Sequence, residues 1–292
     1  MHATVAARRT DLCDPCPTSF YGRIFGMSNA VTHDNEYHDS MVRMLELIWG
    51  RGYMAPGGPG NVAKILQGTE ARGKRILDVG CGIGGPAFEM AHTFDASVVG
   101  IDIEAPLIER ATAAAKEIGM QDRCRFETVE PGPLPFPDQS FDIVVSSGAI
   151  TQTSDKISLL GECHRVLVPG GYLSCYEWMK SERDYSDDMR YWFKLEGLTY
   201  ALETLDELGE RFRAAGFVDV NTRDASAWYR AEAKREYQLI KGALYDDLVG
   251  LLGKKDADHF VENWRAMVVV CDSGEMRQGY CRGRRFNNVR AA

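Results

Sequence analysis

Short apolar segments alternate with helical segments between residues 74 and 179, and this alternation constrains the fold more than any other feature. The apolar segments are KRILDVG (74–80), ASVVGID (96–102), CRFETVE (124–130), FDIVVSS (141–147) and GYLSCYEWM (171–179). Between them we expect helices at 84–94, 105–119 and 156–171 and a loop at 131–140. Because parallel strands need long, usually helical, connections, this order predicts a doubly wound, mostly parallel sheet.

The residues before this core predict a flexible segment and then helices. Residues 1–32 are polar and contain proline, so we expect them to be flexible. From 33 to 72 we expect a helical lid, with a short second helix at 61–67. The apolar residues of its first helix recur at helical spacing: Met41, Met44, Leu45 and Ile48.

The residues after 180 extend the same domain, for which we expect the bounds 73–292. A helix is expected at 204–216, a strand at 217–224 and a final strand at 275–286. The stretch 181–204 is charged and aromatic without a clear period, and 226–270 is mainly helical in pattern. We expect these two stretches to form a substrate lobe.

Charge and cysteine content exclude several classes of protein. The net charge of the 292 residues is −8 and no long basic run is present, so we expect no nucleic-acid partner. No apolar run reaches about 18 residues, and the N-terminus lacks a signal peptide's apolar middle, so no membrane partner and a cytoplasmic location are expected. The eight cysteines are scattered and expected to be reduced. Cys13 and Cys16 form the only close pair, and no metal is expected.

A glycine-rich turn, LDVGCGIGG (77–85), follows the first strand and precedes the first helix. Gly80 and Gly82 allow a ligand to approach the backbone there. Asp78 would repel a pyrophosphate but suits an ammonium group. Asp102, at the end of the second strand, can accept both hydroxyls of a ribose, and Glu130 ends the third strand where an adenine edge would lie. A ribose, an adenine and a cation without phosphate describe S-adenosylmethionine (SAM) better than NAD.

Four motifs carry a family resemblance. ILDVGCGIGG, VGIDI, FPDQSFDIVVSSGAI and HRVLVPGGYL resemble, in this order, the motif series of class I SAM-dependent methyltransferases. The resemblance implies a Rossmann-like sheet, mostly parallel with an antiparallel last strand, with lid helices from the N-terminus and from late insertions. It also implies SAM as cofactor, S-adenosylhomocysteine (SAH) as product, a small-molecule substrate, and a monomer or homodimer. Ser147, which ends the fourth strand, is placed in the same cofactor site.

A wider likeness covers roughly residues 33–285. DNEYHDSMVRMLELIWGRGYMAPGG, SAWYRAEAKREY and QGY resemble phosphoethanolamine N-methyltransferases, and the IWG segment also resembles glycine/sarcosine-type N-methyltransferases. The likeness implies SAM contacts from these residues: Tyr37, Gly80, Asp102, Ile103 and Glu130. Tyr37 would lie in the lid across from the sheet, and its neighbour His38 is a candidate base.

The departures from the phosphoethanolamine enzymes concern the substrate. Gln152 stands where those enzymes have a catalytic histidine. Their phosphate-binding arginine and lysine fall on Leu198 and on the apolar run 267–270. Tyr200 matches a tyrosine of their phosphate pocket, and Trp178 matches an aromatic position. A pocket without the two cations is poorly suited to a phosphomonoester.

These residues predict an N-methyltransferase for a small, non-phosphorylated amine or amino-acid-like metabolite. The candidate catalytic residues are Tyr37, Gln152 and His38. The candidate substrate-binding residues, whose aromatic faces stabilise a cation and whose arginine could pair with a carboxylate, are Gln152, Trp178, Tyr200, Trp228, Tyr229 and Arg230. An S-methyltransferase for a thioether is the alternative, because a thioether has no proton to lose. A SAM-binding protein without catalysis is the third possibility.

Overall fold

The computed structural model describes residues 37, 39–197 and 200–286. The contacts divide the chain into two units, Met1–Asp34 and Asn35–Ala292, and every described residue lies in the second. The expected flexible segment 1–32 lies outside the described residues. So do four residues singled out in the sequence: Cys13, Cys16, His38 and Leu198.

The centre of the fold is a seven-stranded sheet of order β3-β2-β1-β4-β5-β7-β6. Neighbouring strands pair in parallel from β3 to β5, and β7 is antiparallel to both β5 and β6, so the predicted fold class is confirmed. The strands are β1 Arg75–Val79, β2 Ser97–Asp102, β3 Cys124–Thr128, β4 Phe141–Ser147, β5 Leu167–Lys180, β6 Phe217–Asp224 and β7 Met276–Arg285.

β5 begins earlier than the sequence predicts. Its first residue is Leu167, so the residues from 167 to 171, which we expected to end the preceding helix, belong to the strand. Leu167 already pairs with Phe141, and the register shifts before Ile143 pairs with Tyr172. A bulge of this kind accommodates a proline, which has no N–H to donate to the ladder.

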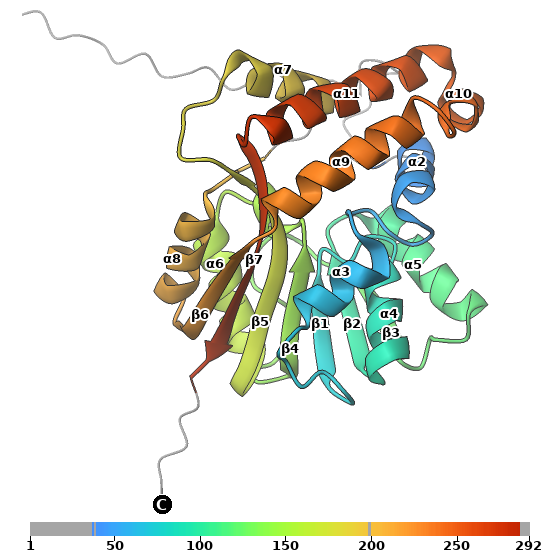
Figure 1. The fold of residues 1–292 in the computed structure, drawn as a ribbon. Helices are drawn as coiled ribbons and strands as arrows, with labels where there is room; N and C mark the ends of the chain where they lie inside the picture. The colour runs from blue at the N-terminus through green and yellow to red at the C-terminus, as the bar shows by residue number, and fades with distance from the viewer. Residues whose placement is uncertain (1–36, 38, 198–199, 287–292) are drawn as a thin grey trace, which may run out of the picture. The chain divides into compact units, whose positions relative to one another are not determined.

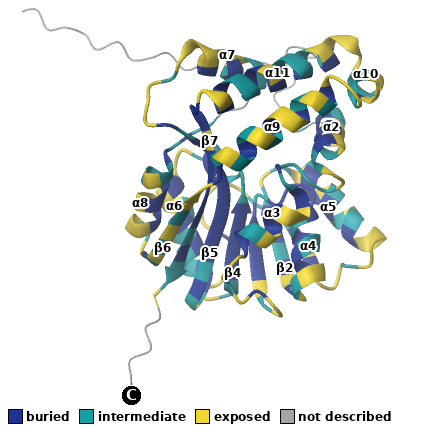
Figure 2. Ribbon diagram, in the orientation of Figure 1, coloured by how far each residue is buried: buried dark blue, intermediate teal, exposed yellow. Residues whose placement is uncertain are grey.

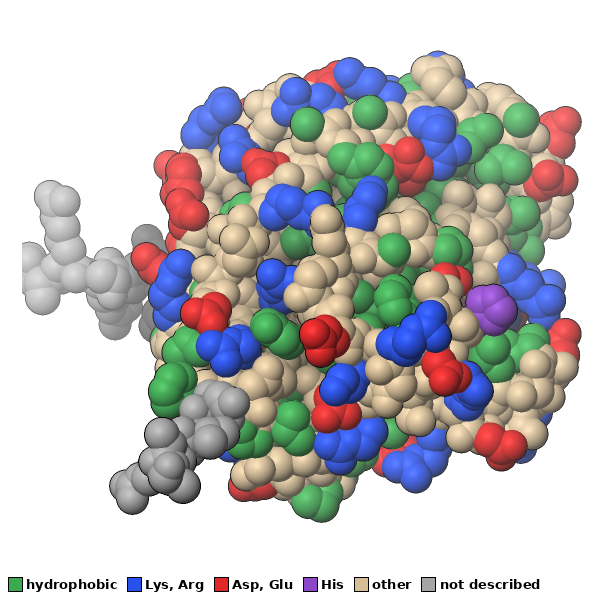
Figure 3. Space-filling model, turned by 60° about the horizontal axis from the view of Figure 1, so that its bottom comes forward, with side chains coloured by type: hydrophobic (Ala, Val, Ile, Leu, Met, Phe, Trp, Pro, Cys, Tyr) green, Lys and Arg blue, Asp and Glu red, His purple; other side chains and the backbone are tan. Residues whose placement is uncertain are grey.

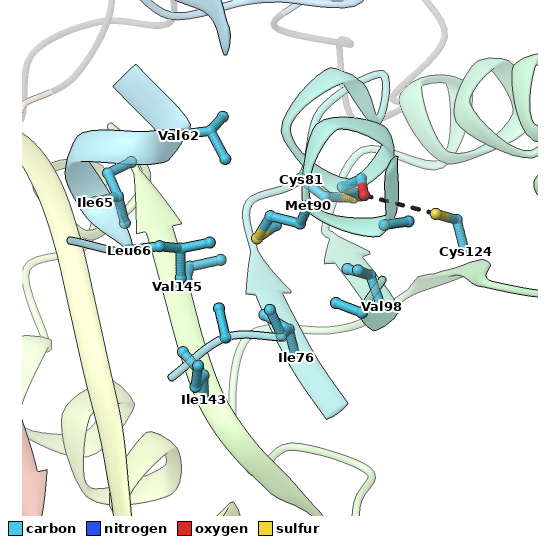
Figure 4. Close-up of a cluster of buried hydrophobic side chains, with 14 of the residues drawn as sticks. Val62, Ile65, Leu66, Ile76, Cys81, Met90, Val98, Cys124, Ile143 and Val145 are labelled. Atoms are coloured by element: carbon cyan, nitrogen blue, oxygen red, sulfur yellow. Dashed lines mark hydrogen bonds between the residues drawn. The ribbon is translucent and has the colours of Figure 1, made fainter. Parts of the chain in front are cut away.

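Helices cover both faces of the sheet (Figure 1). One face carries α3 Gly58–Ile65, α4 Gly85–Phe94 and α5 Ala105–Glu117. The other carries α6 Lys156–Val166 and α8 Leu205–Ala214. Figure 2 shows the central strands, such as β4 and β5, mostly dark blue between helices that are yellow on their outer sides. In Figure 4, side chains of α3 and α4 meet those of β1 and β4, among them Val62, Met90, Ile76 and Val145.

A further set of helices lies beyond the carboxyl ends of the parallel strands (Figure 1). This helical layer consists of α2 Asp39–Trp49, α7 Asp187–Glu196, α9 Ser226–Ile240, α10 Tyr245–Leu252 and α11 Lys254–Asp272. The predicted apolar positions of α2 are buried, and Val42 is buried with them. α7 was not predicted, because its sequence has no clear period. Ser186 begins it, its hydroxyl accepting from the backbone N–H of Met189 at 3.1 Å.

The surface in Figure 3 mixes basic and acidic side chains, without a continuous basic stripe among the described residues on that face. Among the helices that the structure describes, none is long and apolar enough to cross a membrane. The six described cysteines, all buried, are free thiols.

One buried carboxylate connects three helices of the helical layer. Glu236, on α9, is 0% exposed. It accepts hydrogen bonds from the indole N–H of Trp49 on α2 at 2.7 Å and from that of Trp264 on α11 at 3.1 Å. Burial raises the pKa of Glu236 to about 7. The position of α2 therefore depends on a side chain that is nearly 190 residues away in sequence.

We expect Glu236→Ala to destabilise the protein strongly. The substitution leaves two buried indole donors without an acceptor, and each such group costs about 1–3 kcal/mol. The free energy of unfolding, measured by urea denaturation, should fall by at least about 2 kcal/mol. Glu232→Ala on the same helix is the matched control, because it removes only a bond to Arg235 worth about 0–1 kcal/mol. Equal losses in the two variants would contradict this role of Glu236.

Candidate active site

A cavity of about 670 Å³ lies at the carboxyl edge of the sheet. Its wall combines the ends of β1, β2 and β4 with residues of α2, α3 and α11 and with Glu196, the last residue of α7. In open parallel sheets, ligands bind at this edge, where neighbouring crossovers run to opposite faces. The cavity is therefore the candidate active site.

The glycine turn brings two loops into contact at the floor of this cavity. Gly80 and Gly82 have φ values of 72° and 53°. A Cβ atom on Gly80 would come within 2.2 Å of the Cβ of Ala149, in the loop after β4. Glycine is required at position 80 for both its conformation and this close approach.

A buried acid, Asp78, and a half-buried one, Asp102, stand beside the glycine turn. Asp102 accepts from the backbone N–H of Gly82 at 2.9 Å and from that of Glu104 at 3.1 Å. Burial raises the pKa of Asp102, and these backbone hydrogen bonds lower it in part. Asp78 is 2% exposed, and its Oδ2 has no partner among the described residues. Burial, and secondly the charge of Asp102, raise the pKa of Asp78 to about 7.

These acids fit the cofactor that the sequence predicts. The carboxylate of Asp102 has lone pairs left for ribose hydroxyls. The unpartnered oxygen of Asp78 suits a cationic group, since a buried carboxylate is costly until it is paired. Ile103, Glu130 and Ser147 line the same cavity.

The structure brings together two of the predicted catalytic residues. Gln152 ends the short 3-10 helix η1 Ile150–Gln152, directly after β4. Its Nε2 donates to the hydroxyl of Tyr37 at 2.9 Å, although the two residues are 115 positions apart. Both line the cavity, so this contact joins the N-terminal side of the wall to the sheet.

Glu177 holds η1 in place from beneath. This residue of β5 is 2% exposed and accepts from the backbone N–H of Thr151 at 3.0 Å and the hydroxyl of Ser146 at 3.2 Å. Burial raises its pKa to about 7. On the other side, the carbonyl of Thr151 accepts from the N–H of Ala201 at 2.8 Å. The residue before Gln152 is thus fixed by β5 and by the segment after α7.

Most of the predicted site residues lie on the cavity wall. These are Tyr37, Asp78, Gly80, Gly82, Asp102, Ile103, Glu130, Ser147, Gln152, Trp178 and Tyr200. Their individual roles stay predictions.

Three predicted substrate-binding residues of α9 are not among the described residues that line this wall, and their role stays a prediction. The ring of Trp228 is covered by the Nζ of Lys64, 4.3 Å from its centroid. Tyr229 is 1% exposed and packs edge-on against Trp178 at 5.0 Å. The Nε of Arg230 donates to the carbonyl of Cys271 at 3.0 Å. This end of α9 packs against protein rather than facing a ligand.

Several wall residues were not predicted. Among them are Trp49, Phe260, Trp264, Met267 and Glu196. Trp49 belongs to the IWG segment and Met267 to the apolar run, so a family signal existed for both. Glu196 lies in the stretch without a clear period, and nothing in the sequence singles it out.

All charged side chains on the described part of the wall are acidic. They are Asp78, Asp102, Glu104, Glu130, Asp155 and Glu196. No lysine, arginine or histidine is among the described lining residues. The field inside such a cavity attracts cations and repels anions.

The chain matches known methyltransferases. Residues 77–175 match a family described as a methyltransferase domain. The chain is 30% identical to phosphoethanolamine N-methyltransferase 1 of Arabidopsis thaliana over 245 residues, 84% of this chain and 49% of that protein. It is 25% identical to the phosphoethanolamine N-methyltransferase of Plasmodium falciparum over 85% of this chain and 92% of that one. The chain spans about half the length of the plant relatives it matches.

A solved structure shares the fold. Phosphoethanolamine N-methyltransferase 2 of Haemonchus contortus, in complex with phosphomonomethylethanolamine and SAH, superposes with a TM-score of 0.80 at 21% identity. The match covers 87% of this chain and 59% of that one. This likeness shows the fold, and the methyltransferase domain matched at residues 77–175 supports the class I SAM-dependent methyltransferase that the motifs predict.

We expect Gly80→Ala to cost more stability than a matched glycine substitution. Alanine at position 80 meets both an unfavourable backbone conformation and the side chain of Ala149. Gly119 has a φ of 70°, and a Cβ atom there would have nothing within 4 Å, so Gly119→Ala carries only the backbone cost of about 1–2 kcal/mol. In urea denaturation the loss for Gly80→Ala should exceed that for Gly119→Ala by about 1 kcal/mol or more. Similar losses would show that the loops do not need this close approach.

Proposed function

We propose that the chain methylates the nitrogen of a small, positively charged, non-phosphorylated amine, with SAM as methyl donor. The acid-only wall of the cavity is the observation that carries this proposal. A small amine is a cation near neutral pH, so it is attracted to such a cavity. The relatives support N-methylation of a small metabolite, since they are named as phosphoethanolamine N-methyltransferases.

The cofactor would lie along the glycine turn. Asp102 and Glu130 would hold its ribose and adenine, and Asp78 its ammonium group. Structures of the Haemonchus enzyme with SAM and with SAH support this choice of cofactor. SAM supplies an activated methyl group. The acceptor's ammonium group would first lose a proton to solvent; the freed nitrogen lone pair would then form the N–C bond while the S–C electron pair stays on sulfur, giving the methylated ammonium product and SAH.

The protein's contribution is mainly positioning and exclusion of water. Gln152 and Tyr37 form a hydrogen-bonded pair that orients the acceptor without a strong base at that position. The helical layer, together with the residues from 37 to 65, serves as the lid over the site. Trp178, Tyr200 and Trp264 give this side aromatic surface, which stabilises a cation.

The names of the relatives favour a phosphorylated acceptor, whereas the wall favours an unphosphorylated one. A phosphomonoester needs arginine or lysine partners. Met267 lines the cavity where the family pattern leads us to expect part of that cationic pair. The Leu198 position, the other member, is outside the described residues. A phosphate would therefore face the acids without a described cation.

S-methylation of a small thioether is the second candidate. The observation in its favour is Gln152, because a thioether has no proton to lose and needs only orientation. The sulfonium product would be a cation and would also suit the acid-only wall. A cytoplasmic location and a monomeric or dimeric state stay predictions.

The choice of acceptor tests the proposal directly. We expect turnover with SAM to favour ethanolamine, N-methylethanolamine or a similar unphosphorylated amine over phosphoethanolamine by more than about tenfold in kcat/KM, since facing like charges costs several kcal/mol. The measurement is SAH formation across a panel that includes methionine as a thioether. Efficient use of phosphoethanolamine would contradict the non-phosphorylated acceptor, and turnover of the thioether alone would establish the second candidate.

Substitution of Gln152 tests its positioning role. We expect Gln152→Ala to lower kcat/KM by about 3- to 10-fold, the effect of one lost hydrogen bond. Gln152→His should leave SAM affinity nearly unchanged and add a dependence of kcat on pH near about 6.5, where histidine titrates. Affinity is measured by calorimetry and the profile by SAH release across the range in which histidine changes its charge. If neither variant differs from the wild type, Gln152 has no part in the reaction.

A further inference from the structure

We infer that the carboxylate of Glu196 recognises the positive charge of the acceptor, which is a small alkylammonium compound. This inference rests on the proposed function and deepens it, because it names the one residue that recognises the acceptor's charge. Glu196 ends α7 and lines the cavity.

Glu196 differs from the other acids of the wall in its origin. Asp78 lies in β1, Asp102 ends β2 and Glu130 follows β3, so all three stand at the edge of the sheet where the cofactor is expected. On the opposite side, the described wall residues from 37 to 65 and from 196 to 267 are apolar, aromatic or uncharged polar apart from Glu196. It is thus the only charge that this side of the described wall contributes.

The contacts of Glu196 fix its position without neutralising it. The Nδ2 of Asn263 donates to its Oε2 at 2.6 Å, and the hydroxyl of Tyr200 donates to its Oε1 at 3.0 Å. Both donors are uncharged, and no ion pair to Glu196 occurs within the described part of the chain. The Nε2 of the neighbouring His259 is hydrogen-bonded to the carbonyl of Leu195 at 2.9 Å and not to Glu196.

Glu196 is also linked to the segment that carries Gln152. Its partner Tyr200 precedes Ala201, whose N–H donates to the carbonyl of Thr151. Thr151 is the neighbour of Gln152. A short path of two hydrogen bonds therefore joins the carboxylate to the residue that stands in place of the family's histidine.

The surroundings strengthen an attraction between charges at this point. Phe260, Trp264 and Met267 line the wall on α11, and little water competes beside such side chains. The indole N–H of Trp264 is taken by Glu236, so this residue offers ring surface to a ligand and no competing donor. Burial raises the pKa of Glu196, as expected for a carboxylate that lacks a cation. An alkylammonium ion would supply that cation.

Binding of a fixed cation separates this role from catalysis. The probes are choline, which is a permanent cation, and 3,3-dimethylbutan-1-ol, its uncharged isostere, titrated into the full chain with and without SAH. We expect the wild type to prefer choline, and Glu196→Gln to reduce that preference by about tenfold or more, because a close charge pair is strong in a poorly solvated site. The affinity for SAH should stay the same.

Two further variants control for folding and for charge. Glu210→Gln, on the exposed side of α8, removes a negative charge outside the cavity and should keep the preference for choline. Glu196→Asp keeps the charge and should keep most of the preference, whereas a merely structural role would be damaged by both substitutions. Glu196→Gln is expected to fold, since the unpartnered Oδ1 of Asn263 can accept from the new amide.

The outcomes are distinct. If the wild type prefers choline and Glu196→Gln keeps the preference, the assignment to Glu196 is overturned while the proposed function stands. If the wild type binds both probes equally, the assignment is overturned together with the cationic acceptor. Failure of methyl transfer itself is read separately, from the acceptor panel.

Discussion

The parallel pairing of β1 with β4 is the constraint on which the site depends. β1 lies between β2 and β4, with Asp78 paired to Gly100 on one side and to Val145 on the other. The helices that follow β1 and β2 cover one face, and the helix that follows β4 covers the other. The loops after β1 and β4 therefore diverge, and a crevice opens between them. Gly80 is the residue that lets the floor of this crevice close against Ala149.

Asp78 in the wall of the crevice, and Glu177 and Glu236 in the structure that supports the wall, are buried carboxyl groups whose ionised form is costly. Asp78, Glu177 and Glu236 each have a pKa raised to about 7, mainly by burial. A carboxyl whose pKa is raised in the folded protein contributes stability below its unfolded pKa, and this contribution is lost as the pH rises through about 7. A bound cation next to Asp78 would reverse part of that loss, because it favours the ionised form. Ligand charge and protein stability are coupled through the same groups.

Sequence reasoning predicted the sheet half of the site better than the helical half. The alternation of strands and helices predicts the sheet, and parallel strands bring their carboxyl ends to one edge, so residues such as Asp78 and Asp102 are placed by register alone. The helical layer obeys no such rule. α7 has no clear period, and the side of α9 that carries Tyr229 packs against Trp178, which only the tertiary contacts reveal. Glu196 enters the site through this layer, so no sequence pattern pointed to it.

The contrast between the sheet half and the helical half of the site also explains why this chain can have an acid-only wall although its relatives are named for a phosphorylated acceptor. The cofactor side relies on backbone conformation, as at Gly80 and Gly82, and on Asp102, which the Gly82 N–H itself helps to hold. Changes there disturb the fold. The acceptor side consists of side chains on helices, where Met267 or Glu196 can differ from a relative's residue without altering a strand or a turn. If the acceptor binds as proposed, its charge is recognised by the part of the structure that is freest to vary, and similarity of fold does not fix it.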